Sequence, residues 1–132
     1  MVIDHFGIAV TNIDKVVKDY QLLGFKVMKD LIIDPSRNII IQFLENEQGY
    51  CLELIEIYDK TKVSPINVFI DKNNHSIYHT CYKTYDIEKD IDWLHHKGYT
   101  LISKPESAIA FQQKRVCFLY NINIGIIELV EQ

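Results

Sequence analysis

Short apolar runs alternate with amphipathic stretches along the chain. The stretch from about Ile3 to Val10 is an apolar run of strand length, and a helix follows it. Asn12 is a good N-cap residue for that helix, and Gly24 stands where a left-handed C-terminal cap is favoured. The apolar positions of the helix fall at helical spacing: Val16, Tyr20 and Leu23. We expect three strands to follow, which gives the order β-α-β-β-β.

The same order recurs in the second half of the chain. The segment "HFGIAVTNIDKVVKDYQLLGFKV" matches "HTCYKTYDIEKDIDWLHHKGYTL" at a shift of 74 positions, from His5 to His79. Further on, "IIIQFLENEQGYCLEL" matches "KRVCFLYNINIGIIEL" at a shift of 75, from Glu53 to Glu128. A single loop difference accounts for the change of shift. In the second copy the cap, the apolar stripe and the terminal glycine are Asp86, then Ile87, Ile91 and Leu94, then Gly98.

The repeat predicts one α+β domain made of two βαβββ modules with pseudo-twofold symmetry. The first module covers about 1–58 and the second about 76–132, and a connector at about 59–75 joins them. In the connector, Ser64 and Pro65 are a suitable cap and first-turn pair for a short helix. Because there are only two copies, a symmetric pair that shares one site is a better interpretation than a stacked array.

Composition and charge exclude several classes of function. The chain has 132 residues and a formal net charge of -4, so it offers no basic stripe for a nucleic acid. Its longest apolar stretches have strand length, so we expect no membrane partner. The three cysteines, Cys51, Cys81 and Cys117, lie in apolar runs, and the N-terminus does not read as a secretory signal. We therefore expect reduced thiols and a cytoplasmic location.

Each half places one histidine on its first strand and one glutamate on its last strand. Alternation puts His5 on one face with Gly7 and Ala9, and Glu53 on one face with Cys51 and Ile55. His79 and Glu128 have the same places in the second half. A single buried histidine is usually a core residue, and a single glutamate can pair with a lysine. Four at matched places of a repeat instead predict a site for one divalent transition ion, with two coordination positions left open.

The repeat, the "HFGIAVTNIDK" and "YHTCYKTYDIEK" openings and the "ELI" and "ELV" endings resemble the vicinal oxygen chelate superfamily. That group includes glyoxalase I, methylmalonyl-CoA epimerase, extradiol dioxygenases and bleomycin- and fosfomycin-resistance proteins. The resemblance covers essentially the whole chain. It implies paired modules that form a curved mixed sheet around a metal, and it places the ligands at His5, Glu53, His79 and Glu128.

The ligand set is similar to that of bacterial glyoxalase I, which implies nickel or cobalt in preference to zinc. The implied reaction is proton transfer next to a carbonyl through a metal-bound enediolate. Glu128 is the first choice for the base, and Glu53 is the symmetric candidate. The implied substrate is the hemithioacetal of a thiol. Two positions at which many glyoxalase I enzymes hold glutathione are here Ala9 and Ile57.

Two other functions stay open. Methylmalonyl-CoA epimerases usually have glutamine at the place of Glu53, yet "HFGIAVTNI" looks more like an epimerase opening, so an acyl-CoA racemase is the first alternative. A small-molecule binding or resistance protein without chemistry is the second.

Lys114 and Arg115 are candidates to hold the anionic tail of a substrate. The resemblance also implies a homodimer, and leaves open whether each site lies within one chain or is shared across the dimer.

Overall fold

The computed structural model describes residues 1–70 and 76–132, so the end of the predicted connector, 71–75, lies outside the described residues. The chain forms two compact units. One contains His5–Tyr78, and the other contains His79–Gln132 together with the first four residues, Met1–Asp4. An ion pair of 3.3 Å between Lys83 Nζ and Asp4 Oδ1 lies within the second of these.

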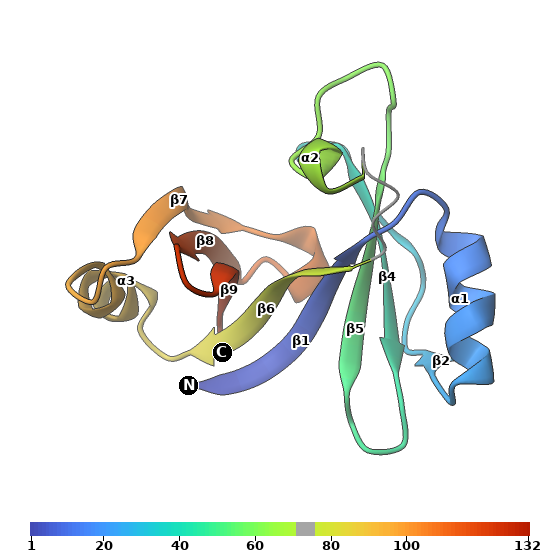
Figure 1. Ribbon diagram of the computed structural model, residues 1–132, viewed down its shortest axis with the longest axis horizontal. Coiled ribbons are helices and arrows are strands. Elements are labelled where there is room, and N and C mark those ends of the chain that lie inside the picture. The colour runs from blue at the N-terminus through green and yellow to red at the C-terminus, as the bar shows by residue number, and fades with distance from the viewer. Residues whose placement is uncertain (71–75) are drawn as a thin grey trace. The chain divides into compact units, whose positions relative to one another are not determined.

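In its described residues, the unit His5–Tyr78 contains two helices and a mixed sheet (Figure 1). Its elements are β1 (Val2–Ala9), α1 (Ile13–Leu22), β2 (Lys26–Val27), β3 (Ile32–Asp34), β4 (Ile39–Glu45), β5 (Cys51–Ile57) and the short helix α2 (Asn67–Ile70). The strand order is β2-β4-β5-β1, with β3 also paired to β4. Strand β1 is parallel to β5, while β4 and β5 are antiparallel. A turn at Ser64 precedes α2, which confirms the short helix expected there.

The other unit repeats this plan. Its elements are β6 (Ile77–Thr84), α3 (Ile87–His95), β7 (Thr100–Ser107), the 3-10 turn η1 (Ile109–Phe111), β8 (Arg115–Asn121) and β9 (Gly125–Glu131). The strand order is β7-β8-β9-β6, and β6 is parallel to β9. The α+β class and the repeat of one strand-helix-strands module, both expected from the sequence, are therefore confirmed, and the second copy has the βαβββ order.

The two copies differ in the strand that follows the helix. In the second copy this strand is the continuous β7, whereas in the first copy β2 and β3 take its place, with four residues between them. In that gap the buried Gln42 side chain donates a hydrogen bond of 2.6 Å from Nε2 to the Lys29 carbonyl oxygen. A side-chain amide thus satisfies a backbone group that lies outside the strand ladder. The three strands predicted after the first helix are consequently four.

Both helices begin and end as the sequence predicts. The side chains of Asn12 and Asp86 each accept a 3.0 Å hydrogen bond from a backbone N–H three residues later. Gly24 and Gly98 adopt φ values of +89° and +91°, which only glycine takes without strain. One predicted inner position is wrong. Leu23 is 72 % exposed because the helix has already ended, and Phe25 packs against the core in its place.

The helix covers one face of the sheet in each unit. Val16, Val17 and Tyr20 of α1 pack against a cluster that includes Ile8, Leu44, Leu52 and Leu54. Ile87 and Leu94 of α3 pack against Cys117, Leu119, Ile127 and Leu129. Burying each leucine contributes about 1.5–3 kcal/mol. Strand side chains alternate between the two faces of a sheet, so the neighbours of these core residues point to the face that the helix does not cover. Those neighbours are the odd-numbered residues of β1, β5 and β6 and the even-numbered residues of β9.

Among the described residues, no helix combines the length and the apolarity that crossing a membrane would require.

We expect Asn12→Ala to lower the free energy of unfolding by about 1 kcal/mol, because the Lys15 N–H loses its side-chain acceptor at the start of α1. Urea unfolding followed by circular dichroism measures this change. Thr11→Ala, at the exposed neighbouring residue, is the matched control and should leave stability nearly unchanged. Equal losses in the two variants would show that the cap contributes nothing.

Candidate metal centre

One histidine and one glutamate meet on the face of the first sheet that α1 does not cover. His5 on β1 is fully buried, and Glu53 on β5 is 4 % exposed. Their side chains meet at 3.1 Å, between His5 Nε2 and Glu53 Oε2. In the parallel register, Glu53 lies beside Gly7 of β1. Its side chain therefore reaches back along β1 to His5, which is two residues before Gly7.

The second unit holds a matching pair. His79 on β6 and Glu128 on β9 are 2 % and 3 % exposed, and 3.2 Å separates His79 Nε2 from Glu128 Oε2. Here the parallel register places Glu128 beside Cys81, again two residues after the histidine. Each unit thus contains a buried His/Glu pair, as the two-residue alternation of the strands predicts.

A phenylalanine accompanies each pair. Phe43 lies opposite Glu53 in the antiparallel register of β4 and β5, and Phe118 lies opposite Glu128 in that of β8 and β9. Each ring makes an edge contact with the histidine of its pair. The ring centroids are 5.8 Å apart for His5 and Phe43, and 5.5 Å for His79 and Phe118. Sequence reasoning did not single out these two phenylalanines, although the repeat aligns them with each other.

The donors in the two pairs suit a divalent transition ion. A carboxylate in an apolar sheet face requires a positive charge beside it, because burial of an isolated charge costs several kcal/mol. Imidazole nitrogen and carboxylate oxygen are ligands that zinc, nickel and cobalt accept. A protonated histidine next to each glutamate would supply the same charge without a metal. The residues thus fit a divalent metal ion by their chemistry, and a measurement of bound metal distinguishes this assignment from two protonated histidines.

The remaining glutamates of β5 and β9 serve structure on the opposite, helix-covered face. Glu56 Oε2 accepts a 2.9 Å hydrogen bond from the Ile13 N–H at the start of α1. Glu131 instead binds Arg115, whose Nε donates to Glu131 Oε2 at 3.0 Å. Glu56 and Glu131 each lie three residues after the inward-facing glutamate of their strand, so alternation turns them away from it.

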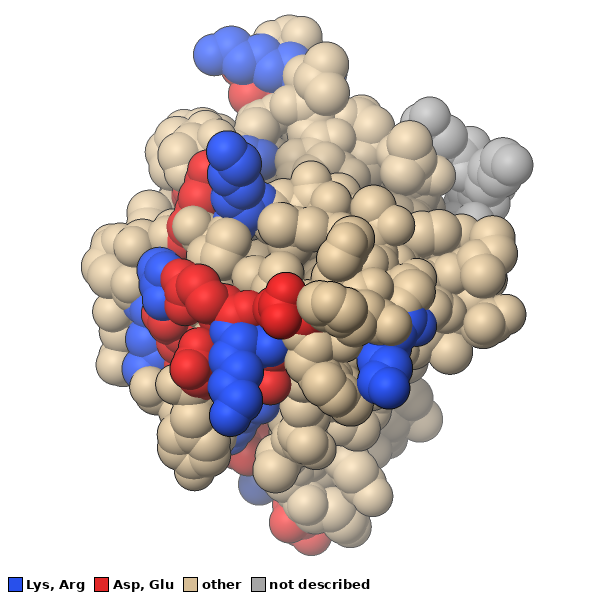
Figure 2. Space-filling view, turned by 90° about the vertical axis from the view of Figure 1, so that its left-hand side faces the viewer, with Lys and Arg blue, Asp and Glu red and all other residues tan. Residues whose placement is uncertain are grey.

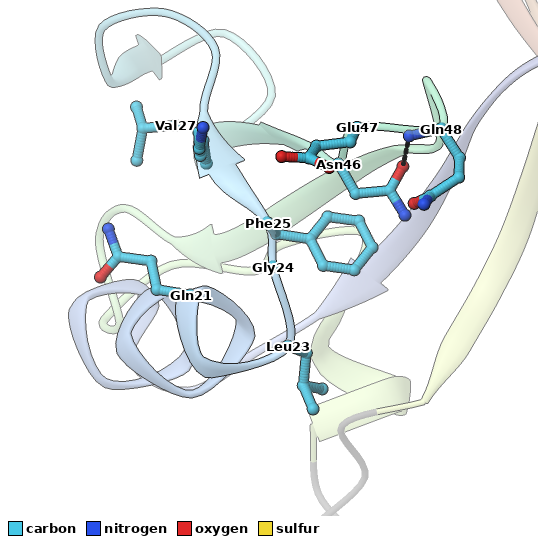
Figure 3. A pocket seen from close by; sticks show the side chains of 9 residues that line it. Gln21, Leu23, Gly24, Phe25, Val27, Asn46, Glu47 and Gln48 are labelled. Atoms are coloured by element: carbon cyan, nitrogen blue, oxygen red, sulfur yellow. Dashed lines mark hydrogen bonds between the residues drawn. The ribbon is translucent and has the colours of Figure 1, made fainter.

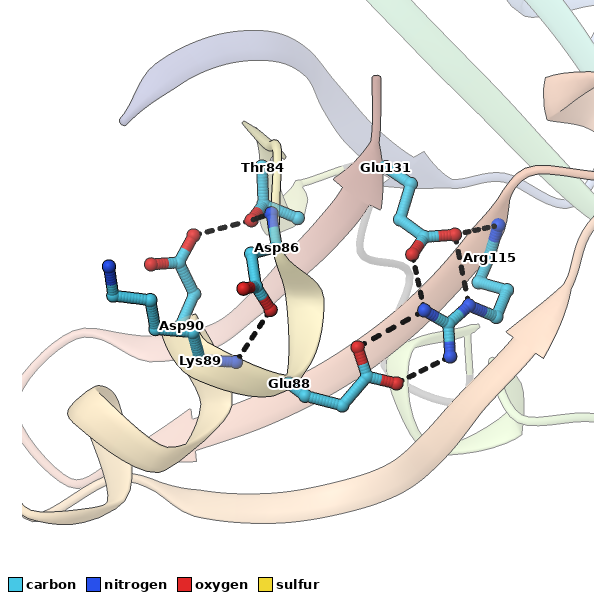
Figure 4. A network of polar contacts seen from close by, with 7 residues as sticks. All are labelled: Thr84, Asp86, Glu88, Lys89, Asp90, Arg115 and Glu131. Atoms are coloured by element: carbon cyan, nitrogen blue, oxygen red, sulfur yellow. Dashed lines mark hydrogen bonds and ion pairs between the residues drawn. The ribbon is translucent and has the colours of Figure 1, made fainter.

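Arg115 joins β8, β9 and α3 through two carboxylates, as Figure 4 shows. In addition to Glu131 it binds Glu88, at 3.1 Å from Nη2 to Glu88 Oε2. The hydrogen bonds from its guanidinium hold the pKa of both carboxyl groups below their usual range. Lys114 is exposed. That Lys114 and Arg115 hold the anionic tail of a substrate stays a prediction.

Figure 2 shows the surface on the side of Figure 1 where α3 lies, and there positively and negatively charged residues lie side by side among many uncharged ones. Helix α3 itself carries exposed residues of both signs, among them Glu88, Lys89 and Asp92. Such a mixed surface is ordinary for a globular protein.

None of the three cysteines, all of which the structure describes, forms a disulfide bond. Cys81 is fully buried and packs with Ala108, Val116 and Val130, as a small hydrophobic residue does. Burial, together with the charge of Glu128, raises the pKa of the Cys117 thiol to about 12. Cys117 is therefore protonated at neutral pH and is unsuited to be a nucleophile.

A pocket of about 580 Å³ lies in the unit His5–Tyr78, between the end of α1, strand β2 and the turn before β5. Figure 3 shows the Phe25 ring extending toward the turn that contains Asn46 and Gln48. The Asn46 side chain closes this turn by accepting a 3.1 Å hydrogen bond from the Gln48 N–H. No residue of the His5–Glu53 pair lines this pocket, so the pocket and the pair are separate features.

Comparison with known proteins identifies the family. The model of the Glyoxalase/Bleomycin resistance protein/Dioxygenase superfamily matches residues 4–118. The chain belongs to this superfamily, as its ligand pattern and its repeated βαβββ order led us to expect. A search of curated proteins finds no significant match.

Solved structures similar to this chain agree with that assignment. A hypothetical protein, BH1468, from Bacillus halodurans C-125 is 30 % identical, with a TM-score of 0.84 over 98 % of this chain and 93 % of that one. Methylmalonyl-CoA epimerase from Mycobacterium tuberculosis is 24 % identical, with a TM-score of 0.82 over 98 % and 87 %. A Streptomyces coelicolor methylmalonyl-CoA epimerase variant in complex with 2-nitronate-propionyl-CoA is 23 % identical, with a TM-score of 0.81 over 100 % and 97 %. The two epimerases share the fold of this chain.

The Arg115 contacts predict a specific dependence of stability on pH. The pKa values of Glu88 and Glu131 are lowered in the folded protein, so their contribution is complete above the unfolded value of about 4.3 and is lost as the pH falls. We expect the difference in urea midpoint between the wild type and Arg115→Met to shrink between about pH 7 and about pH 3. Lys89→Met, at an exposed lysine of α3, is the control for the loss of one positive charge. A difference that does not change with pH would contradict the assignment.

Proposed function

We propose that His5, Glu53, His79 and Glu128 bind one divalent metal ion, and that the chain is an enzyme that moves a proton on the carbon next to a carbonyl group. The observation that carries this proposal is the duplication of a buried His/Glu pair, at 3.1 Å in one unit and 3.2 Å in the other. Neither pair alone offers enough ligands for a catalytic ion, whereas the two together offer four and leave open positions for a substrate.

The charges of the four residues also support the proposal. Two carboxylates and two neutral imidazoles carry a charge of minus two, which a divalent cation neutralises. The same set with two protonated histidines would be neutral as well, but it would require two additional charged groups in a buried apolar surface. One ion removes that requirement for both pairs at once.

When bound, the ion would supply Lewis acidity toward a substrate carbonyl oxygen, which increases the acidity of the neighbouring C–H. The residues of the chain have separate roles. His5 and His79 orient the site, each supported by the edge of a phenylalanine ring. Glu128 takes the proton from carbon and returns it, either to the adjacent carbon or to the other face of the same carbon. Glu53 is the symmetric candidate for this role.

Two substrate classes remain candidates, each favoured by a specific observation. The glutamate at position 53 favours the glyoxalase I type, in which the proton moves between adjacent carbons of a hemithioacetal. The fold shared with methylmalonyl-CoA epimerases favours an acyl-CoA and return of the proton to the same carbon. Ala9 and Ile57, which stand where glutathione contacts would lie, are buried in the core and cannot grip a carboxylate. Glutathione is therefore the less favoured thiol.

The choice of metal, with nickel or cobalt before zinc, is part of the proposal. The homodimer and the cytoplasmic location expected from the sequence remain predictions.

We expect Glu128→Gln to lower turnover by about 10²- to 10⁴-fold, because an amide cannot take a proton from carbon. The protein is loaded with nickel, cobalt or zinc, and solvent deuterium incorporation next to the carbonyl is measured for methylmalonyl-CoA and for several hemithioacetals. Glu128→Gln should keep measurable metal, so the loss belongs to the chemical step.

Two variants control this experiment. Glu131→Gln changes the neighbouring glutamate on the opposite face and should leave turnover nearly intact. Glu53→Gln separates the two candidate bases, since it retains turnover if Glu128 is the base. Full activity of Glu128→Gln would remove that residue from the role, and exchange with no substrate in any metal form would reject the reaction.

A further inference from the structure

We propose that the pocket between the end of α1, strand β2 and the turn from β4 to β5 binds a free α-amino acid with a large apolar side chain. The volume of this pocket, about 580 Å³, lies within the range of small-molecule sites. The pocket shares no residue with the His5–Glu53 pair. The inference therefore goes beyond the function proposed above and requires no contact between the amino acid and a metal.

The two units treat the place of this pocket differently. In the second unit the Asn121 side chain donates a 3.5 Å hydrogen bond from Nδ2 to the carbonyl oxygen of Gly98, the glycine that follows α3. The equivalent residues of the first unit, Asn46 and Gly24, line the pocket instead. A hydrogen bond thus spans this place in one unit, whereas a pocket lies there in the other.

Two side chains of opposite charge line the pocket. Lys26 on β2 and Glu47 in the turn are exposed, and neither forms an ion pair with another described residue. Figure 3 shows Glu47 extending from its turn toward the β2 side of the pocket. Their counterparts in the second unit, Thr100 and Ile122, are uncharged. A zwitterion matches both charges, whereas a simple anion or cation would meet one repulsive group.

The edge of the sheet adds two backbone groups. Strand β2 ends the strand order, and the Met28 N–H donates to the Phe43 carbonyl oxygen on β4 at 3.0 Å. The N–H and C=O of a trans peptide point in opposite directions, so the Val27 C=O points away from β4. In an extended strand the Val27 N–H points the same way as its C=O. Val27 lines the pocket, and the α-ammonium and α-carboxylate of one amino acid match its acceptor and its donor.

Apolar groups form the rest of the pocket. Leu23 is exposed, and the half-buried Phe25 ring packs against Tyr20 with the ring centroids 5.4 Å apart. The Phe25 ring extends toward the turn in Figure 3, so it presents an apolar surface inside the pocket. A ligand with an apolar side chain would remove Leu23 and Phe25 from water. The pocket therefore complements both parts of an apolar amino acid, its charged backbone groups and its side chain.

Nuclear magnetic resonance of the full-length chain tests this assignment. The protein is loaded with zinc, which is diamagnetic, and is titrated with L-leucine and with L-phenylalanine. Amide shifts then report both the affinity and the place of binding, and we expect them at Val27, at Glu47 and at their neighbours. N-acetyl-L-leucinamide keeps the leucine side chain but has neither charge. It should bind at least about tenfold more weakly than L-leucine.

Two variants remove the charges of the pocket one at a time. Lys26→Met and Glu47→Gln should each weaken L-leucine binding by about tenfold, because each leaves one charge of the ligand without its partner. Lys15→Met and Asp14→Asn are the matched controls, since both residues are exposed in the first turn of α1 and neither lines the pocket. Both controls should bind L-leucine as the wild type does.

Several results would overturn the proposal: no binding of either amino acid, equal binding of the blocked compound, or an unchanged affinity in either pocket variant. Shifts confined to the strands that carry the His/Glu pairs would show that the amino acid binds the metal, and would overturn it as well. None of these results bears on the proposed function, which proton exchange and metal content test separately.

Discussion

A carboxylate buried beside an imidazole, once in each half of the chain, is the constraint on which the rest of the structure depends. Glu53 and Glu128 lie on apolar sheet faces with almost no exposure, and each has a buried histidine within 3.2 Å. A shift of one residue in the register of β5 or β9 would turn the glutamate to the helix-covered face and bring an apolar residue to the histidine. The strand registers, the helices that cover the opposite face and the chemistry of the site therefore depend on one another.

Duplication supplies equal ligands and leaves the surroundings free to differ. The registers that bring each glutamate to its histidine are the same in both units, and so are the phenylalanine contacts. Around them the copies diverge. Gly7 corresponds to Cys81, and the helix-capping Glu56 corresponds to the arginine-bound Glu131. A symmetric set of donors suits an ion, whereas the unequal surroundings suit a substrate that has two different ends.

Periodicity and capping chemistry were sufficient to predict much of this architecture. The capping preferences of single residues predict where the helices begin and end. The structure has the predicted N-caps, Asn12 and Asp86, and the predicted terminal glycines, Gly24 and Gly98. Alternation along four strands identified both His/Glu pairs, because a two-residue period fixes which side chains share a face. The repeat strengthened each of these predictions, because the same residue pattern occurs at matched positions in both halves of the chain.

Features that depend on tertiary contacts were not predictable in the same way. The split between β2 and β3 depends on a side chain from β4, the Gln42 amide, and the exposure of Leu23 depends on where the helix ends. The binding of Arg115 by carboxylates from α3 and β9 joins residues that are far apart in sequence. The position of Lys29 over Phe43 likewise requires the fold before it can be seen.

The central claim is that the two pairs hold one common ion, and metal stoichiometry tests it most directly. Nickel bound per chain is measured by elemental analysis after reconstitution and gel filtration, for the wild type, His5→Ala and His79→Ala, with folding checked by circular dichroism. The account predicts one tightly bound ion per chain in the wild type and loss of that same ion in both variants. Two ions per chain, or one that survives either substitution, would contradict it.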